Sequence, residues 1–259
     1  MSENYLNLTG IEFTEFSSED PKSLHNLFQA FGFSRLMRHC DKKIDLYQQN
    51  DIVFLLNYEP QSFGSDFYKN HGPCISAMGW RVQDSKIAHE TALSRGATDG
   101  TIKGDYTLKD NSIPSIFGIG DSLIYLVDAK TEGDRYENMG FKKLEKPDMV
   151  PSLGFTVMDH LTNNVAKGEM ARWSKFYKEI FGFTEVRYFD IKGAKTGLTS
   201  FALRSPDGSF CIPINEGSDA KSQINEYLEE YKGAGVQHIA FLTNDIVSSV
   251  AAIQKAGNY

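Results

Sequence analysis

The chain repeats one pattern of predicted elements, and this repeat restricts the folds that it can adopt. Segments 27–33 and 177–183 each end an amphipathic helix in Phe-Gly-Phe, with the glycine placed to terminate the helix. A strand with alternating apolar residues precedes each helix, and three β-rich stretches follow it. The pattern is therefore a βαβββ unit. Its predicted strands are 11–16, 34–39, 44–49 and 52–58 in one copy and 154–161, 184–191, 198–204 and 210–215 in the other.

A second pair of matching segments indicates four such units. Strand 74–82 and the helix that begins at Asp84 match strand 237–243 and the helix that begins at Asp245, which lies 161 positions later. The four units then start at about residues 10, 72, 152 and 236. Only the first strand and the helix of the fourth unit precede Tyr259, so we expect its three remaining strands beyond this residue.

This order of units predicts an α+β fold with two domains of paired βαβββ units, the fourth unit being incomplete. Each pair forms two half-barrels around a cavity, and the side chains that alternate inward along the strands line this cavity. We expect the first domain to span residues 1–130 and the second to span residues 151–259. The polar stretch 131–150 between them contains two glycines and a proline and is interpreted as a linker.

Composition and charge narrow the class of protein. With 41% hydrophobic and 24% charged residues, the chain resembles soluble globular proteins, and no apolar run approaches the roughly 20 residues that span a membrane. A net charge of -7 opposes binding to nucleic acid, which needs clustered basic residues. The N-terminus lacks the basic and apolar regions of a secretory signal. The three cysteines form no CxxC pattern, so we expect free thiols in a cytoplasmic protein.

Two histidines are the strongest candidates for chemistry. His160 and His238 each lie in a predicted strand that leads into a helix, and two neutral imidazoles are two of the three ligands in a two-histidine, one-carboxylate Fe(II) site. In the repeat they correspond to Phe13 and Ala77, so the first domain lacks metal ligands and the second would carry the chemistry. Spacing and repeat alone leave a metal site and a structural role equally open. The remaining histidines are interpreted as surface residues: His25, His39, His71 and His89.

The four-unit layout, together with the segments around both histidines, resembles the 4-hydroxyphenylpyruvate dioxygenase family of the vicinal-oxygen-chelate superfamily. The likeness covers the whole chain and is strongest from about residue 150 to residue 243. A superfamily member that only binds a ligand would not be expected to keep all of the matching segments. These segments are 31–33, 71–73, 159–165, 197–200, 213–216, 221–224 and 233–238.

The resemblance implies Fe(II) held by His160, His238 and a glutamate on the last strand of the fourth unit, which is expected beyond Tyr259. It implies no catalytic residue separate from this metal centre. Gln237 could instead hydrogen-bond the histidine beside it. The residues that the resemblance assigns to the substrate cavity are Ser200, Asn215, Gln223 and Gln237.

The resemblance also implies a reaction, in which 4-hydroxyphenylpyruvate and O2 give homogentisate and CO2 in tyrosine and phenylalanine catabolism. The partners would be a small aromatic 2-oxo acid and O2, and the protein would form dimers or tetramers. Three alternatives stay open: a 4-hydroxymandelate synthase, a ring-cleaving dioxygenase of the extradiol type, and a ligand-binding module of the same fold without activity. Without the third ligand and the remaining strands, residues 1–259 alone are expected to be inactive and to expose unpaired strand edges.

Overall fold

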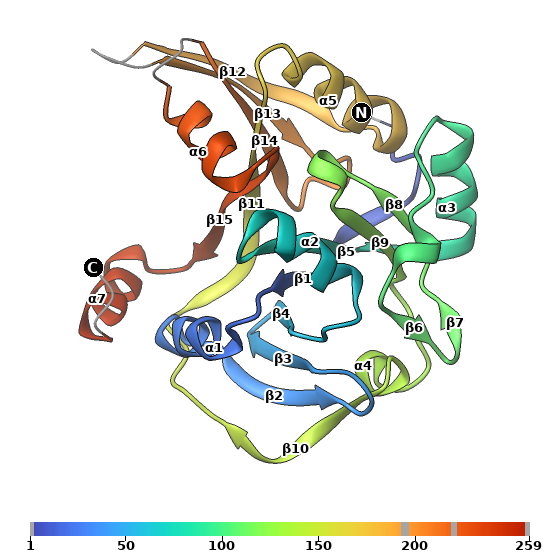
Figure 1. Cartoon of the computed structure of the whole chain (residues 1–259), viewed down its shortest axis with the longest axis vertical. Coiled ribbons are helices and arrows are strands. Elements are labelled where there is room, and N and C mark those ends of the chain that lie inside the picture. Colours follow the sequence, from blue (N-terminus) through green and yellow to red (C-terminus); the bar gives the residue numbers. More distant parts are fainter. Residues whose placement is uncertain (1–2, 193–196, 219–221, 257–259) are drawn as a thin grey trace.

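The computed structural model describes residues 3–192, 197–218 and 222–256 (Figure 1). It contains an eight-stranded sheet in the order β10-β2-β3-β4-β1-β5-β9-β8, a five-stranded sheet in the order β12-β13-β14-β11-β15, and the small hairpin β6-β7. The elements of the first sheet and its helices are β1 (Leu8–Ser17), α1 (Pro21–Ala30), β2 (Ser34–His39), β3 (Ile44–Gln49), β4 (Ile52–Asn57), α2 (Phe63–His71), β5 (Cys74–Val82), α3 (Ser85–Ser94), β6 (Thr107–Leu108), β7 (Asn111–Ser112), β8 (Ser115–Phe117), β9 (Leu123–Asp128), α4 (Arg135–Asn138) and β10 (Phe141–Asp148). Those of the second are β11 (Phe155–Val165), α5 (Met170–Phe176), β12 (Thr184–Lys192), β13 (Gly197–Arg204), β14 (Cys211–Gly217), α6 (Gln223–Tyr231), β15 (Gly235–Thr243) and α7 (Ile246–Lys255).

The two sheets share one pattern of strand pairing. In the first, β1 pairs in parallel with β4 and antiparallel with β5, and in the second, β11 pairs in parallel with β14 and antiparallel with β15. The parallel pairs arise because a helix crosses over between the first strand of a unit and the three strands that follow it. The predicted α+β fold of paired βαβββ units is therefore confirmed, and the fourth unit supplies β15 and α7 within the described residues.

The stretch 131–150, interpreted as a linker from its composition, is more ordered than predicted. It contains the short helix α4 and the strand β10, which pairs antiparallel with β2 at the edge of the first sheet. The exposed lysines and glutamates of β10 gave a polar pattern, because an edge strand can leave most of its side chains in water. The first sheet thus continues to Asp148.

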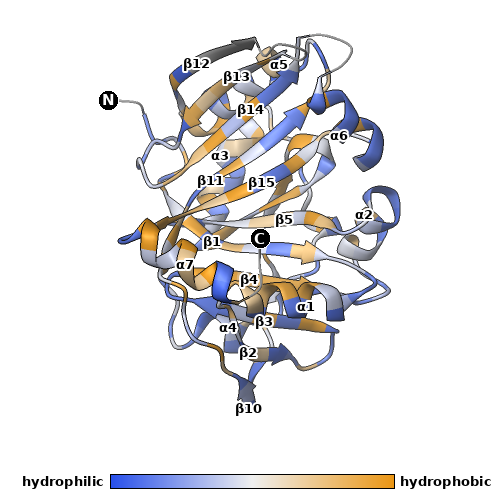
Figure 2. Cartoon of the chain, turned by 90° about the vertical axis from the view of Figure 1, so that its left-hand side faces the viewer, coloured by the Kyte–Doolittle hydropathy of each residue, from blue (hydrophilic) through white to orange (hydrophobic). Residues whose placement is uncertain are grey.

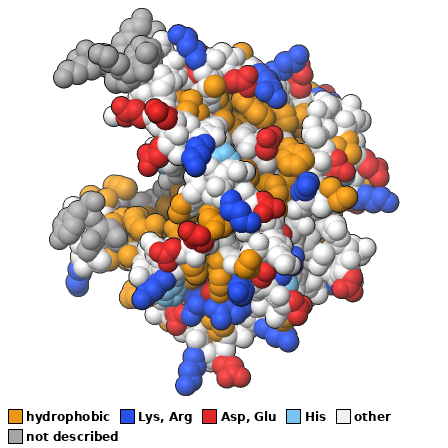
Figure 3. Space-filling view, viewed as in Figure 1, with side chains coloured by type: hydrophobic (Ala, Val, Ile, Leu, Met, Phe, Trp, Pro, Cys, Tyr) orange, Lys and Arg blue, Asp and Glu red, His pale blue; other side chains and the backbone are white. Residues whose placement is uncertain are grey.

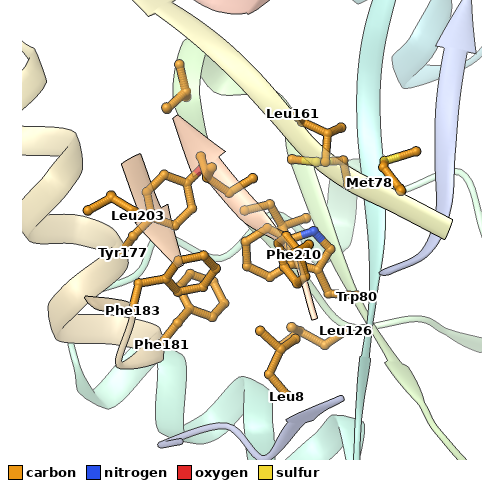
Figure 4. Close-up of a cluster of buried hydrophobic side chains, with 14 of the residues drawn as sticks. Leu8, Met78, Trp80, Leu126, Leu161, Tyr177, Phe181, Phe183, Leu203 and Phe210 are labelled. Carbon is orange, nitrogen blue, oxygen red and sulfur yellow. The ribbon is translucent and has the colours of Figure 1, made fainter. Parts of the chain in front are cut away.

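A common apolar core joins the two sheets. Figure 2 shows the strands of the second sheet side by side, with β15 next to β5 of the first. Trp80 of β5 is fully buried and packs against rings of the second half, with its ring centroid 4.8 Å from that of Phe181 and 5.2 Å from that of Phe210 (Figure 4). Among the described residues, no helix combines the length and apolar character needed to cross a membrane.

The second Phe-Gly-Phe sequence shows why its glycine is needed. Helix α5 ends in one π-helical turn (Tyr177–Phe181), and Gly182 then adopts φ 84° in the left-handed region. A side chain on Gly182 would also collide with the carbonyl oxygen of Glu3. The glycine therefore ends the helix and lets Phe181 and Phe183 turn back onto the core around Trp80.

Candidate metal and substrate site

Strands β11 and β15 bring the two predicted metal ligands together. His238 lies directly opposite Thr162 in the antiparallel register, and His160 lies two residues from Thr162 on the same face of the sheet. The two imidazole centroids are 5.5 Å apart, with an interplanar angle of 78°. Both rings retain access to solvent. Figure 3 shows that the surface on the side of β15 is hollowed between α6 and α7.

A β-bulge lies beside each histidine, and sequence reasoning did not predict either of them. Asp159 is the extra residue on β11 next to His160, and Gln237 is the extra residue on β15 next to His238. A bulge breaks the alternation of side chains, so each extra residue can reach its neighbour. The Asp159 carboxylate lies 2.6 Å from Nδ1 of His160, and the Gln237 amide oxygen contacts Nδ1 of His238.

These contacts select one tautomer of each imidazole. With a carboxylate or amide oxygen at Nδ1, each ring carries its proton there and presents a free Nε2. Partial desolvation, followed by the charge of His160, lowers the pKa of His238. The lowered pKa keeps His238 neutral to a lower pH than an imidazole in water, as metal binding requires. The two imidazoles therefore lie on the same side of the sheet, with Nδ1 of each ring turned to the bulge residue beside it.

A row of polar side chains continues this face toward the other strands. Ser200 of β13 pairs with Asn215 of β14, and Asn215 pairs with Asn164 of β11. Asn215 donates a hydrogen bond through Nδ2 to Oδ1 of Asn164 at 3.3 Å. Ser200 and Asn164 are buried, and Asn215 is half-buried. Sequence reasoning missed Asn164, although stepping by two from His160 would have placed it on the same face.

The other two predicted substrate residues lie on different elements. Gln237 is exposed on β15 and contacts His238, which agrees with the alternative that it supports a histidine. Gln223 is the first residue of α6 and is exposed. Its position over the sheet depends on how α6 is docked, because the helix shares no ladder of backbone hydrogen bonds with the strands.

The third metal ligand is not found in the part of the chain that the structure describes. Within residues 3–192, 197–218 and 222–256, no three histidine, cysteine, aspartate or glutamate side chains are grouped so that they could hold a metal. Glu216, the glutamate closest in sequence to Asn215, accepts hydrogen bonds from the backbone of Gly168 and Met170 instead. A glutamate beyond Tyr259 stays a prediction.

Comparison with known proteins identifies the family. Residues 2–144 match the family described as "Hydroxyphenylpyruvate dioxygenase, HPPD, N-terminal", and residues 157–258 match the "Glyoxalase/Bleomycin resistance protein/Dioxygenase superfamily". A 4-hydroxyphenylpyruvate dioxygenase of Pseudomonas sp. (strain P.J. 874) is 42% identical over 258 residues, which cover 98% of this chain and 71% of that protein. The chain belongs to the 4-hydroxyphenylpyruvate dioxygenase family.

A further relative and a solved structure are similar to this chain over most of its length. Protein MelA of Shewanella colwelliana is 54% identical over 253 residues, which cover 97% of this chain and 72% of MelA. A solved structure of a triple mutant of 4-hydroxymandelate synthase from Streptomyces coelicolor aligns with a TM-score of 0.83 over 97% of this chain and 76% of its own. Its 20% identity shows a shared fold alone.

The first domain of this 4-hydroxyphenylpyruvate dioxygenase family member repeats the two bulges without the histidines. The extra residues are Glu12 on β1 and Ser76 on β5, and the register pairs Phe13 with Gly79 and Glu15 with Ala77. Phe13 and Ala77 therefore occupy the positions of His160 and His238, as the repeat predicted. The Phe13 ring fills the space that a side chain on Gly79 would need.

Glu15, the counterpart of Thr162, is a buried carboxylate of the first domain. It is fully buried and accepts hydrogen bonds from Ser76 at 2.5 Å and from Ser17 at 3.3 Å. Burial, reinforced by the charge of Asp105, raises its pKa from 4.5 to about 7. The folded protein therefore holds a proton on Glu15 over a pH range in which the unfolded chain has released it.

We expect Glu15→Gln to flatten the pH dependence of stability. Because the pKa of Glu15 is raised in the fold, its contribution to stability is fully present below about pH 4.5 and is lost as the pH rises through about 7. Relative to the wild type, the variant should gain about 2 kcal/mol in free energy of unfolding between pH 5 and pH 8. Urea denaturation at both pH values measures this change. Glu229→Gln, at an exposed position on α6, controls for net charge and should show no gain in stability. If the free energy of unfolding changes with pH equally in the wild type and in Glu15→Gln, the expectation is contradicted.

Proposed function

We propose that the protein is an Fe(II)-dependent dioxygenase that converts 4-hydroxyphenylpyruvate and O2 to homogentisate and CO2. The observation that carries this proposal is the pair of imidazoles on β11 and β15, 5.5 Å apart, each with Nδ1 held by the bulge residue beside it. His160 and His238 would supply two metal ligands through Nε2, and a carboxylate would supply the third. Asp159 and Gln237 would hold the rings in the correct tautomer.

The donor set suits the substrate class. Fe(II) at this site would supply O2 activation and bind a 2-oxo acid through its carboxylate and keto oxygens. The 2-oxo acid and O2 together balance the reaction: one oxygen atom enters the ring, the other enters the new carboxylate, and the original carboxylate carbon leaves as CO2. No separate reductant is required. The protein's task is then to orient the aromatic ring and to exclude water.

The polar row on β13, β14 and β11 supports a role in orienting the ring. Ser200, Asn215 and Asn164 share one face with the histidines and are shielded from water to different degrees. Hydroxyl and amide groups can hydrogen-bond the phenol at the far end of the substrate. Gln223 would complete this polar end from α6. We propose that the reaction belongs to tyrosine and phenylalanine catabolism and that the enzyme, with its free thiols, is cytoplasmic. We also propose that it assembles as a dimer or tetramer.

Product analysis tests the proposed reaction. The full-length protein is loaded with Fe(II) without oxygen, mixed with 4-hydroxyphenylpyruvate and then exposed to air. We expect homogentisate by NMR and mass spectrometry, with one CO2 released for each O2 consumed. A sample without added iron should be inactive. Formation of 4-hydroxymandelate, cleavage of a catechol to a yellow product, or substrate binding without turnover would each replace the proposal with one of the alternatives.

A further inference from the structure

The loop between α6 and β15 is held by the first domain. His71, the last residue of α2, lies with Nδ1 2.7 Å from the carbonyl oxygen of Tyr231, the last residue of α6. The two rings also stack, with centroids 4.6 Å apart and an interplanar angle of 25°. His71 is therefore half-buried between the domains, and its interpretation as a surface residue was wrong. Its contact partner lies 160 positions away in the sequence.

Contacts on both sides of His71 extend this attachment. Phe67 packs against the histidine within the first domain, with centroids 4.5 Å apart, and Tyr227 stacks on Tyr231 at 5.0 Å within α6. Gly120 of the first domain lies so close to the carbonyl of Ala234 that a side chain there would collide with it. The end of α6 and the start of β15 are thus seated against two separate segments of the first domain.

Helix α2 is itself anchored at its other end. The carboxylate of Asp105 accepts hydrogen bonds from the backbone nitrogens of Phe63 at 3.1 Å and of Gly64 at 3.2 Å. A carboxylate at a helix N-terminus satisfies amides that have no partner within the helix and complements the helix dipole. Because α2 is fixed at its start, it presents His71 to α6 from a rigid support.

Strand β15 and helix α6 depend on the His71–Tyr231 contact to different degrees. Strand β15 is aligned by its hydrogen-bond ladder with β11, which places His238 independently of His71. Helix α6 is a nine-residue rod, roughly 13 Å long, with Tyr231 at one end and Gln223 at the other. A small tilt at Tyr231 therefore moves Gln223 relative to the sheet. The attachment at His71 fixes the Tyr231 end of α6, while Ser222 at the other end lies against Gly217 of β14.

We propose that His71 is a positioning residue, which holds α6 through Tyr231 so that Gln223 reaches the substrate cavity. This proposal rests on the proposed function for its kinetic consequence, and it assigns the first domain a part in substrate binding although that domain lacks the metal ligands. The hydrogen bond to the Tyr231 carbonyl and the stacking of the two rings both hold the end of α6 in place. Loss of the contact should weaken binding of the aromatic 2-oxo acid and leave Fe(II) binding unchanged.

Three substitutions separate the two interactions. His71→Phe keeps a stacking ring and removes the Nδ1 donor, His71→Asn keeps a donor nearly in the same place and removes the ring, and His71→Ala removes both. In the full-length protein we expect His71→Ala to raise KM about tenfold, to lower kcat less than threefold and to leave the Kd for Fe(II) within twofold of the wild type. The other two variants should recover part of the affinity for substrate.

Hydrogen exchange gives a readout that does not need turnover. In His71→Ala the amides of α6 should exchange faster, whereas the amides of β11 and β15 keep their protection. The matched control is His25→Ala, since His25 of α1 also bonds a tyrosine, with Nδ1 2.8 Å from the Tyr47 hydroxyl; it should leave KM and α6 exchange unchanged. Unaltered exchange in α6, or faster exchange throughout the chain with a matching loss of Fe(II) affinity, would overturn the proposal. If the wild type does not turn over 4-hydroxyphenylpyruvate, the proposed function fails, and the exchange of α6 still decides the role of His71.

Discussion

Fe(II) binding and turnover should both be lost in His160→Ala and in His238→Ala, while the fold remains intact. Each substitution removes one of two nitrogen donors, and the remaining imidazole cannot hold the metal in the geometry that β11 and β15 provide. We expect the affinity for Fe(II) to fall at least about 100-fold, which exceeds the effect of losing a residue that only orients a ligand. Neither histidine belongs to the apolar core, so the far-ultraviolet circular dichroism should not change.

The measurement is the iron content of protein equilibrated with Fe(II), together with O2 uptake in the presence of substrate. His89→Ala is a suitable control, because His89 lies on α3 and bonds the exposed Asp99. Asp159→Asn should give an intermediate result, with a loss of about 10- to 100-fold in affinity for Fe(II). The substitution weakens the hydrogen bond at Nδ1 of His160 but leaves Nε2, the proposed metal donor, in place. Wild-type iron content and activity in either alanine variant would exclude the metal assignment.

The largest loss of stability is expected for Trp80→Ala. Trp80 is fully buried, and its ring contacts those of Phe181, Phe183 and Phe210, which all belong to the second half of the chain. Removing it deletes the apolar surface of the largest core side chain and leaves a cavity between the sheets, at a cost of about 3–5 kcal/mol. The cost falls on the contact between the domains, so their unfolding should also become less cooperative.

Urea denaturation followed by circular dichroism measures this loss, and Trp80→Phe should recover part of it because an aromatic ring remains. Trp173→Ala provides the matched control: it removes the only other tryptophan, a partly exposed residue on α5, and should cost about 1 kcal/mol or less. Equal losses for the two alanine variants would show that the rings around Trp80 do not join the domains as described.

Sequence reasoning found the features that depend on local pattern. The bounds of β2 and β3 agree with the predicted strands, because alternating side chains and tight turns are visible within a few residues. The repeat also placed Phe13 and Ala77 at the positions of the histidines, and the register of both sheets confirms this. Features that depend on contacts between residues distant in the sequence were not predicted.

Three such features were not predicted. The bulges at Asp159 and Gln237 exist only as a mismatch in register between two strands, and one strand's sequence does not reveal them. The role of His71 depends on Tyr231, with which it shares no local pattern. The strand β10 was not predicted because its side chains are mostly charged. An edge strand pairs on one side only and can leave such side chains in water.

The shared bulges have a consequence for how a metal would be bound. The first domain keeps a bulge at Glu12 and another at Ser76 although Phe13 and Ala77 stand where the ligands would be, so the fold itself maintains these kinks without any ion. In the second domain the same backbone places both imidazoles on one face of the sheet, with their centroids 5.5 Å apart. If the proposed metal site is correct, binding of a cation should require dehydration and loss of protons but little movement of the chain, and the strands would serve as a preformed template for coordination.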